Sequence, residues 1–145
     1  MRPCRQNNQG AAMSSPRTVA FVCLHGSAKS VIAAEYLERE ARARGIDARA
    51  SAAGQEPDPD YPPHVLAGMS ARGFKLLGRA PRGANAEDLA QADRIVSFGC
   101  DLSTLAPGRE IERWDDCPAV SDGFDGAWDV ITRKVDALLA EEATR

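Results

Sequence analysis

A cysteine, a lysine and a serine lie within one short segment, in a spacing that suits nucleophilic chemistry on an anion. Cys23 ends an apolar run, and Lys29 and Ser30 follow where a helical pattern begins. The thiolate is the reactive form of cysteine, and loop N–H groups, the positive end of a helix dipole and an ammonium group all favour it. The Ser30 hydroxyl could hydrogen-bond to the sulfur. The segment predicts a thiolate facing an oxyanion; a buried structural cysteine is the alternative.

The residues between Cys23 and Lys29 suit a loop that wraps around a tetrahedral anion. Small side chains at Gly26, Ser27 and Ala28 let the backbone approach a bound oxyanion closely. His25 could tune Cys23 or contact the substrate, or it could be an exposed loop residue. The residues expected to bind the substrate are Leu24, His25, Gly26, Ser27, Ala28 and Lys29.

Short apolar runs alternate with helical patterns along the chain, which is typical of a parallel α/β sheet. Strands are expected over 19–22, 47–53, 94–98 and 110–114, and helices over 27–44, 63–72, 86–90 and 122–142. We therefore predict a doubly wound, four-stranded parallel sheet flanked by helices on both faces. Ligands of such folds bind outside the carboxyl ends of the strands. Cys23, Cys100 and the segment 114–116 each follow a strand and can converge at that edge.

Several residues indicate where the expected helices begin, end or bury a face. Gly45 suits the left-handed position after the helix over 27–44, and Asn85 suits the N-cap of the helix over 86–90. Four prolines within 55–63 predict a loop. The last helix carries a buried stripe, with Trp128 expected in the core rather than on a ligand: Trp128, Ile131, Val135 and Leu138.

Length and composition indicate one ordinary globular domain. The 145 residues are 43% hydrophobic and 27% charged, and the net charge is −3. We expect a disordered N-terminal tail over 1–16, with Met13 as a possible natural start, and a single domain over 17–145. The acidic balance argues against nucleic acid as a partner. No apolar run approaches the about 18 to 20 residues of a membrane span, and no signal peptide is evident. We therefore expect a cytoplasmic protein with no membrane partner.

The four cysteines do not have the density of a disulfide framework, and in a reducing compartment they are expected to be thiols. No pair has the short spacing of a zinc site, and the two histidines do not complete one, so no metal or other cofactor is expected. Cys4 lies in the expected tail, Cys117 is expected to be structural, and His64 is expected to cap a helix or to be solvated.

The chain resembles the low-molecular-weight protein tyrosine phosphatase superfamily, which also contains the thioredoxin- and mycothiol-coupled arsenate reductases. The active-site loop of that superfamily is a cysteine, five residues, an arginine and a serine directly after the first strand. Cys23, Lys29 and Ser30 fall on these positions. Further resemblances occur in order between 18 and 142, at Ser51–Gly54, Gly73–Lys75, Arg79–Arg82, Ala92–Val96 and Arg113–Pro118.

The resemblance implies that Cys23 forms a covalent adduct with the phosphorus or arsenic of a bound oxyanion, which the loop amides, Lys29 and Ser30 hold. The implied substrate is a phosphomonoester, including phosphotyrosine, or arsenate, and no metal is required. Cys100 matches the resolving thiol of the arsenate reductases, although a core role for it is equally open. Pro107 stands where the thioredoxin-coupled enzymes need a further cysteine. Cys117 could substitute for it, or a small thiol such as mycothiol could resolve the adduct instead. Thioredoxin or mycothiol are thus the implied partners of a reductase.

The chain departs from the superfamily pattern at two positions. Lys29 replaces the arginine and supplies a point charge rather than a bidentate fork, so it should clamp a transferring phosphoryl group less well. The superfamily acid is an aspartate directly before a proline, but Cys117 precedes Pro118 here. Asp116, or else Asp115, is therefore expected to protonate the leaving group, unless both are solvated loop acids. These departures support an alternative function as a weakly active or inactive oxyanion-binding regulator.

Overall fold

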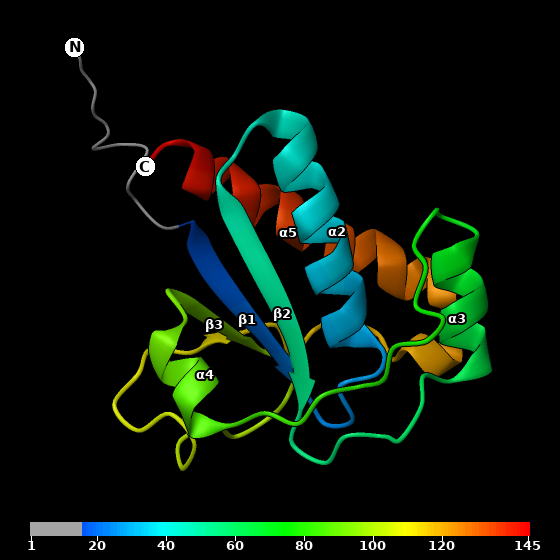
Figure 1. Cartoon of the computed structure of the whole chain (residues 1–145), viewed down its shortest axis with the longest axis horizontal. Coiled ribbons are helices and arrows are strands. Elements are labelled where there is room, and N and C mark those ends of the chain that lie inside the picture. The colour runs from blue at the N-terminus through cyan, green and yellow to red at the C-terminus, as the bar shows by residue number, and fades with distance from the viewer. Residues whose placement is uncertain (1–15) are drawn as a thin grey trace.

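Four parallel strands form the centre of the molecule (Figure 1). The computed structural model describes residues 16–145, so Cys4, Met13 and the predicted tail up to residue 15 lie outside the described residues. The strand order is β2-β1-β3-β4, which confirms the predicted parallel sheet. The strands are β1 (Arg17–Cys23), β2 (Ala48–Gly54), β3 (Arg94–Ser97) and β4 (Glu112–Arg113).

Helices cover both faces of the sheet (Figure 1). The long helices α2 (Lys29–Arg44) and α5 (Phe124–Ala143) pack on one face, and the short helix α4 (Ala86–Gln91) lies on the other. Helix α3 (Pro63–Ser70) stands beside α5, which the 3-10 turn η1 (Val120–Asp122) precedes. No helix within residues 16–145 combines the length and apolarity needed to cross a membrane.

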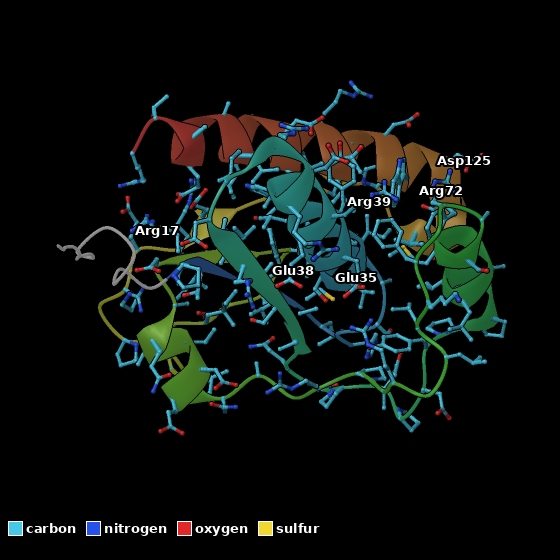
Figure 2. All side chains as sticks on the ribbon, turned by 45° about the horizontal axis from the view of Figure 1, so that its top comes forward. Arg17, Glu35, Glu38, Arg39, Arg72 and Asp125 are labelled. Atoms are coloured by element: carbon cyan, nitrogen blue, oxygen red, sulfur yellow. The ribbon has the colours of Figure 1, made fainter. Side chains whose placement is uncertain are left out.

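The segment after α3 is attached to both long helices through arginine side chains (Figure 2). The Arg39 guanidinium of α2 lies 4.1 Å from the centre of the Phe74 ring and donates a hydrogen bond to the Arg72 carbonyl at 2.7 Å. Arg72 in turn forms an ion pair with Asp125 at the start of α5. These contacts fix the position of α3, whose preceding loop borders the carboxyl edge of the sheet.

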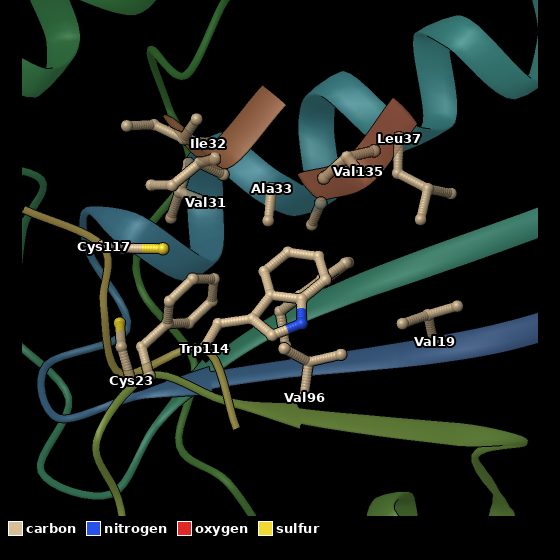
Figure 3. Packing of buried hydrophobic residues seen from close by; sticks show 14 of the residues in the cluster. Val19, Cys23, Val31, Ile32, Ala33, Leu37, Val96, Trp114, Cys117 and Val135 are labelled. Atoms are coloured by element: carbon tan, nitrogen blue, oxygen red, sulfur yellow. The ribbon is translucent and has the colours of Figure 1, made fainter. Parts of the chain in front are cut away.

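The central strand β1 is apolar and buried on both faces from Val19 to Cys23. Val19, Phe21 and Cys23 belong to the larger core cluster, which the sheet forms with α2 and α5 (Figure 3). Ala20 and Val22 belong to the smaller cluster on the α4 side. Successive residues of a strand point to opposite faces, so Cys23 lies on the α2 side of the sheet.

The predicted ends of the helices agree with the structure at most positions. Gly45 has φ of 69° after α2, and Asn85 Oδ1 accepts a hydrogen bond from the Asp88 N–H at 2.8 Å, which confirms both predicted caps. In α5, Ile131, Val135 and Leu138 are buried as predicted. Trp128 is half-buried and packs edge-on against Tyr36, with 5.6 Å between ring centres, on the surface of the core.

Some element boundaries differ from the prediction. Helix α2 begins at Lys29 rather than at residue 27, because Ser27 and Ala28 belong to the loop that follows β1. Strand β4 covers only Glu112–Arg113, shorter than the predicted 110–114. The remaining differences are of one or two residues at the ends of β1, β2, β3, α3, α4 and α5.

The strand register brings several loops together at one edge of the sheet. Cys23 is opposite Gly54, Val22 is opposite Ser97, and Ser97 is opposite Arg113. The segments that follow these strand ends therefore start side by side, as expected for the ligand-binding edge of a parallel sheet.

Candidate active site

Cys23 is the last residue of β1, and its sulfur lies directly against a buried hydroxyl. Its Sγ is 3.0 Å from Ser30 Oγ in the first turn of α2. Ser30 is completely buried, and Cys23 is 7% exposed. A hydroxyl at this distance can donate to a thiolate, so Ser30 can stabilise the charged sulfur.

The loop over 24–28 is pressed tightly against the end of β2. Gly26 has φ of 63°, which glycine adopts without strain. A Cβ at Gly26 would lie 2.5 Å from the Gly54 nitrogen, and a Cβ at Gly54 would lie 2.5 Å from the Gly26 nitrogen. Only two glycines allow this approach, so Gly26 and Gly54 together set the path of the loop.

The loop after β1 forms hydrogen bonds through its carbonyl groups but not through its N–H groups. The carbonyls of Cys23, Leu24 and His25 accept from the N–H groups of Gln55, Glu56 and Asp58, at 3.2, 2.8 and 3.0 Å. Within residues 16–145, no hydrogen-bond acceptor faces the N–H groups of residues 24–28.

Two of these residues, Gly26 and Ser27, are buried. A buried N–H without an acceptor is rare in folded proteins, so these groups require a partner. Successive backbone N–H groups of this kind form an anion-binding nest.

The start of α2 adds to this positive field. Its N-cap is Ala28, whose methyl group cannot accept a hydrogen bond from the first-turn N–H groups, and no acidic residue lies in that turn. The N-terminus of a 16-residue helix carries a partial positive charge and free N–H donors, which favour an anion.

A cavity of about 270 Å³ opens beside the loop and contains most of the predicted substrate-binding residues. Leu24, His25, Ser27, Ala28 and Lys29 line it together with Cys23, whereas Gly26 turns away against Gly54. The other lining residues come from three further segments: Asp58, Pro62, His64, Phe98, Ala119, Val120 and Ser121.

Lys29 joins the loop to the segment that follows β4. Its Nζ donates a hydrogen bond to the Cys117 carbonyl at 3.1 Å while the side chain lines the cavity. An ammonium group carries three protons, so this bond leaves donors for an anion. Lys29 can therefore act as a charge at the cavity and as a tie between two loops.

The structure does not bring Asp115 or Asp116 into the lining of the cavity. Asp115 accepts from the Gly99 N–H at 2.9 Å and from Arg113 Nε at 3.0 Å. Asp116 Oδ1 lies 3.0 Å from Lys134 Nζ, and this hydrogen bond lowers the pKa of Asp116. A lowered pKa keeps the carboxylate ionised, which is unfavourable for a proton donor. Their role as the acid stays a prediction.

The two other described cysteines are buried near the site but do not line the cavity. Cys117 belongs to the same core cluster as Cys23 (Figure 3), whereas Cys100 belongs to the cluster on the opposite face of the sheet. Burial raises the pKa of both thiols, and the Cys23 charge adds to the effect at Cys100. Both are thereby kept as thiols, and the resolving role of Cys100 stays a prediction.

Asp58 is a site residue that the sequence did not reveal. Its Oδ2 accepts from Ser27 Oγ at 2.7 Å, and its Oδ1 lies 3.6 Å from His25 Nδ1. Asp58 stands between two prolines in a segment predicted only as a loop. The proline content predicts an irregular path but not its direction. In a parallel sheet, the loops after β1 and β2 begin at the same edge, and this was the one feature from which Asp58 could have been predicted near Cys23.

No three His, Cys, Asp or Glu side chains within residues 16–145 are grouped as metal ligands. The site therefore offers an anion a set of N–H donors, one ammonium group and a sulfur nucleophile. This arrangement suits covalent chemistry on a tetrahedral oxyanion.

The chain is similar in sequence and structure to known phosphatases and arsenate reductases, which are enzymes. The model of the family described as low molecular weight phosphotyrosine protein phosphatase matches residues 18–106. A Halobacterium salinarum protein named "Putative arsenate reductase" is 27% identical over 87 residues, which are 59% of this chain. The chain spans 61% of the length of that curated relative.

Two solved structures share the fold. YfkJ from Bacillus subtilis superimposes with a TM-score of 0.78 at 21% identity, over 91% of this chain and 98% of YfkJ. The thioredoxin-dependent arsenate reductase of Corynebacterium glutamicum superimposes with a TM-score of 0.77 at 23% identity, over 91% of this chain and 64% of the reductase. The family match covers more than half of the chain and includes β1, the loop after it and β3. The chain therefore belongs to the low molecular weight phosphotyrosine protein phosphatase family.

Proposed function

We propose that this protein is a cysteine-dependent phosphomonoester hydrolase that acts through a covalent intermediate on Cys23. The observation that carries this proposal is the set of loop N–H groups over 24–28 that have no acceptor in the described structure and lie next to the Cys23 sulfur. A phosphoryl group has three oxygens that can accept from such donors, and its phosphorus would then lie near the nucleophile.

In the first step, Cys23 Sγ bonds to phosphorus and the ester P–O bond breaks. In the second step, water attacks phosphorus, the P–S bond breaks and the thiolate leaves. The loop N–H groups, Lys29 and the start of α2 stabilise the charge that spreads over the phosphoryl oxygens. The Ser30 hydroxyl, 3.0 Å from the sulfur, stabilises the thiolate before attack and again as it leaves.

Arsenate reduction is the second candidate, because the chain is similar to proteins named as arsenate reductases. Arsenate is also a tetrahedral oxyanion, so the same loop would hold it, and Cys23 would bond to arsenic. A second thiol must then attack the adduct. Cys100 follows β3 but does not line the cavity, so either this segment moves or thioredoxin or mycothiol supplies the thiol.

The test compares the wild-type chain with Cys23→Ser on p-nitrophenyl phosphate. We expect turnover and a phosphorylated protein in rapid-quench mass spectrometry for the wild type, and neither for the variant. Titration calorimetry with phosphate checks that the variant keeps its binding site. In a parallel assay, the chain is supplied with arsenate and with either thioredoxin or mycothiol, and the arsenite formed is measured. Loss of arsenite formation in Cys100→Ser would identify Cys100 as the resolving thiol. If the chain binds phosphate but shows no turnover in any assay, the enzyme hypothesis is wrong and the chain is an oxyanion-binding regulator.

A further inference from the structure

The proposed hydrolysis requires a proton donor for the leaving oxygen, and the cavity lining contains neither of the predicted acids. Apart from Cys23 and Lys29, the titratable side chains that line it are His25, Asp58 and His64. His25 and Asp58 interact directly, and they come from the loops that follow the two neighbouring strands β1 and β2.

The surroundings of His25 determine which ring nitrogen exchanges a proton. Nδ1 lies 3.2 Å from the Glu56 carbonyl oxygen, which can only accept a hydrogen bond. Nδ1 must therefore carry a hydrogen to form this bond. No residue within 16–145 forms a hydrogen bond with Nε2, and about half of the side chain is exposed. Nε2 is consequently the nitrogen that can lose and regain a proton.

Asp58 is held beside the His25 ring by its own hydrogen bonds. Its N–H donates to the His25 carbonyl at 3.0 Å, and Oδ2 accepts from Ser27 Oγ, a residue that is 3% exposed. Oδ1 faces His25 Nδ1 at 3.6 Å. Both carboxylate oxygens thus have partners, so Asp58 supplies a negative charge beside the ring rather than a proton to the substrate.

We propose that His25 is the proton donor of the reaction and that Asp58 is its positioning residue. This inference rests on the proposed hydrolase function. As Cys23 Sγ bonds to phosphorus and the P–O bond breaks, the leaving oxygen takes the proton from Nε2. As water attacks the phosphocysteine, its proton passes to Nε2 and the Cys23 thiolate leaves. The cycle returns the imidazolium and the thiolate, and no further reactant is consumed.

The first test uses the dependence of the rate on the leaving group. A proton donor matters most when the leaving oxygen is basic, so His25→Gln should lower kcat/KM for phenyl phosphate about 10²- to 10⁴-fold and for p-nitrophenyl phosphate far less. Equal losses on both substrates would overturn the assignment. The assignment would also be overturned if Asp116→Asn or His64→Gln, rather than His25→Gln, lowered kcat/KM selectively for phenyl phosphate. Absence of phosphorylated wild-type protein would instead count against the hydrolase function.

The second test examines Asp58 through the same dependence on the leaving group. Asp58→Asn removes the carboxylate that faces the His25 ring, so kcat/KM for phenyl phosphate should fall more than for p-nitrophenyl phosphate, in the same sense as in His25→Gln. Asp60→Asn is the matched control, because Asp60 is exposed in the same loop. Equal losses on both substrates in Asp58→Asn, or a selective loss in Asp60→Asn, would contradict the role of Asp58.

A third measurement needs no turnover. ¹⁵N NMR of the wild-type chain should show neutral His25 with hydrogen on Nδ1, and this preference should weaken in Asp58→Asn but not in Asp60→Asn. Hydrogen on Nε2 of neutral His25, or the same preference in all three proteins, would overturn the proposal even if the enzyme were inactive on every substrate.

Discussion

Ser30 and Lys29 are neighbours in sequence, but their side chains have different surroundings. Ser30 is completely buried under the Cys23 sulfur, whereas Lys29 lines the cavity and reaches the Cys117 carbonyl. Lysine supplies a point charge without the planar fork of arginine. In the proposed reaction, directional contacts to the oxyanion would therefore come mainly from the backbone N–H groups over 24–28, and Ser30 would be the side chain that stabilises the thiolate.

Ser30→Ala should reduce turnover while leaving the fold intact. A hydrogen bond to a charged group contributes about 1.5–3 kcal/mol, so the rate at neutral pH should fall about 10- to 100-fold. The measurements are kcat on p-nitrophenyl phosphate and the rate of Cys23 alkylation by iodoacetamide at neutral pH, which should fall together. Ser70→Ala on the exposed end of α3 is the matched control. An unchanged alkylation rate in Ser30→Ala would show that the hydroxyl does not stabilise the thiolate.

At the scale of the elements, the sequence predicted what local patterns determine and missed what depends on contacts between distant segments. The apolar run of β1 and the Asn85 cap depend on neighbouring residues, and both were predicted. The loop over 24–28 depends instead on Gly54, which is distant in sequence but opposite Cys23 in the sheet.

Gly54→Ala should displace the loop over 24–28. The added Cβ would lie 2.5 Å from the Gly26 nitrogen and the His25 carbonyl carbon, which are backbone atoms that cannot rotate away. We expect a loss of about 1–3 kcal/mol in the free energy of urea unfolding and weaker phosphate binding by calorimetry. Gly126→Ala is the control, because no atom lies within 4 Å of its Cβ position on the exposed side of α5. It should gain about 0.5–1 kcal/mol and bind phosphate normally. Normal phosphate binding by Gly54→Ala would refute this account of the loop.

At the scale of the whole molecule, the sequence predicted the parallel sheet and the position of Cys23 at its edge, but not the full set of side chains there. Asp116 was expected in the site and pairs with Lys134 of α5 instead, while Asp58 enters from a proline-rich loop. Neither outcome has a local signal, because each depends on how loops without regular structure pack after the sheet has formed. Charge pairs such as Asp116 and Lys134 are set by tertiary proximity alone.

The amino edge of the sheet is held by ion pairs that connect β1, β3, β4 and α5. The Glu142 side chain is 1% exposed, and its oxygens accept from Arg17 Nε at 2.9 Å and from an Arg94 guanidinium nitrogen at 3.1 Å. Arg94 also binds Glu112 of β4 at 2.7 Å. Burial opposes the charge on Glu142, but the hydrogen bonds from Arg17 and Arg94 outweigh it and lower the pKa of Glu142.

Glu142→Gln should destabilise the fold in a way that depends on pH. Glu142→Gln removes a buried carboxylate that pairs with two arginines, although Arg94 keeps Glu112 as a partner, so the free energy of urea unfolding should fall by about 1–3 kcal/mol at neutral pH. Because the pKa of Glu142 is lower in the folded chain than the ordinary value of 4.5, its stabilisation is complete above that pH and disappears as the pH falls through the folded value. The difference between wild type and variant should therefore shrink in acid. Glu141→Gln removes a 64% exposed partner of Arg94 and should change stability by less than about 1 kcal/mol. A Glu142→Gln difference that stayed constant from neutral pH into acid would show that its ionised carboxylate does not stabilise the fold.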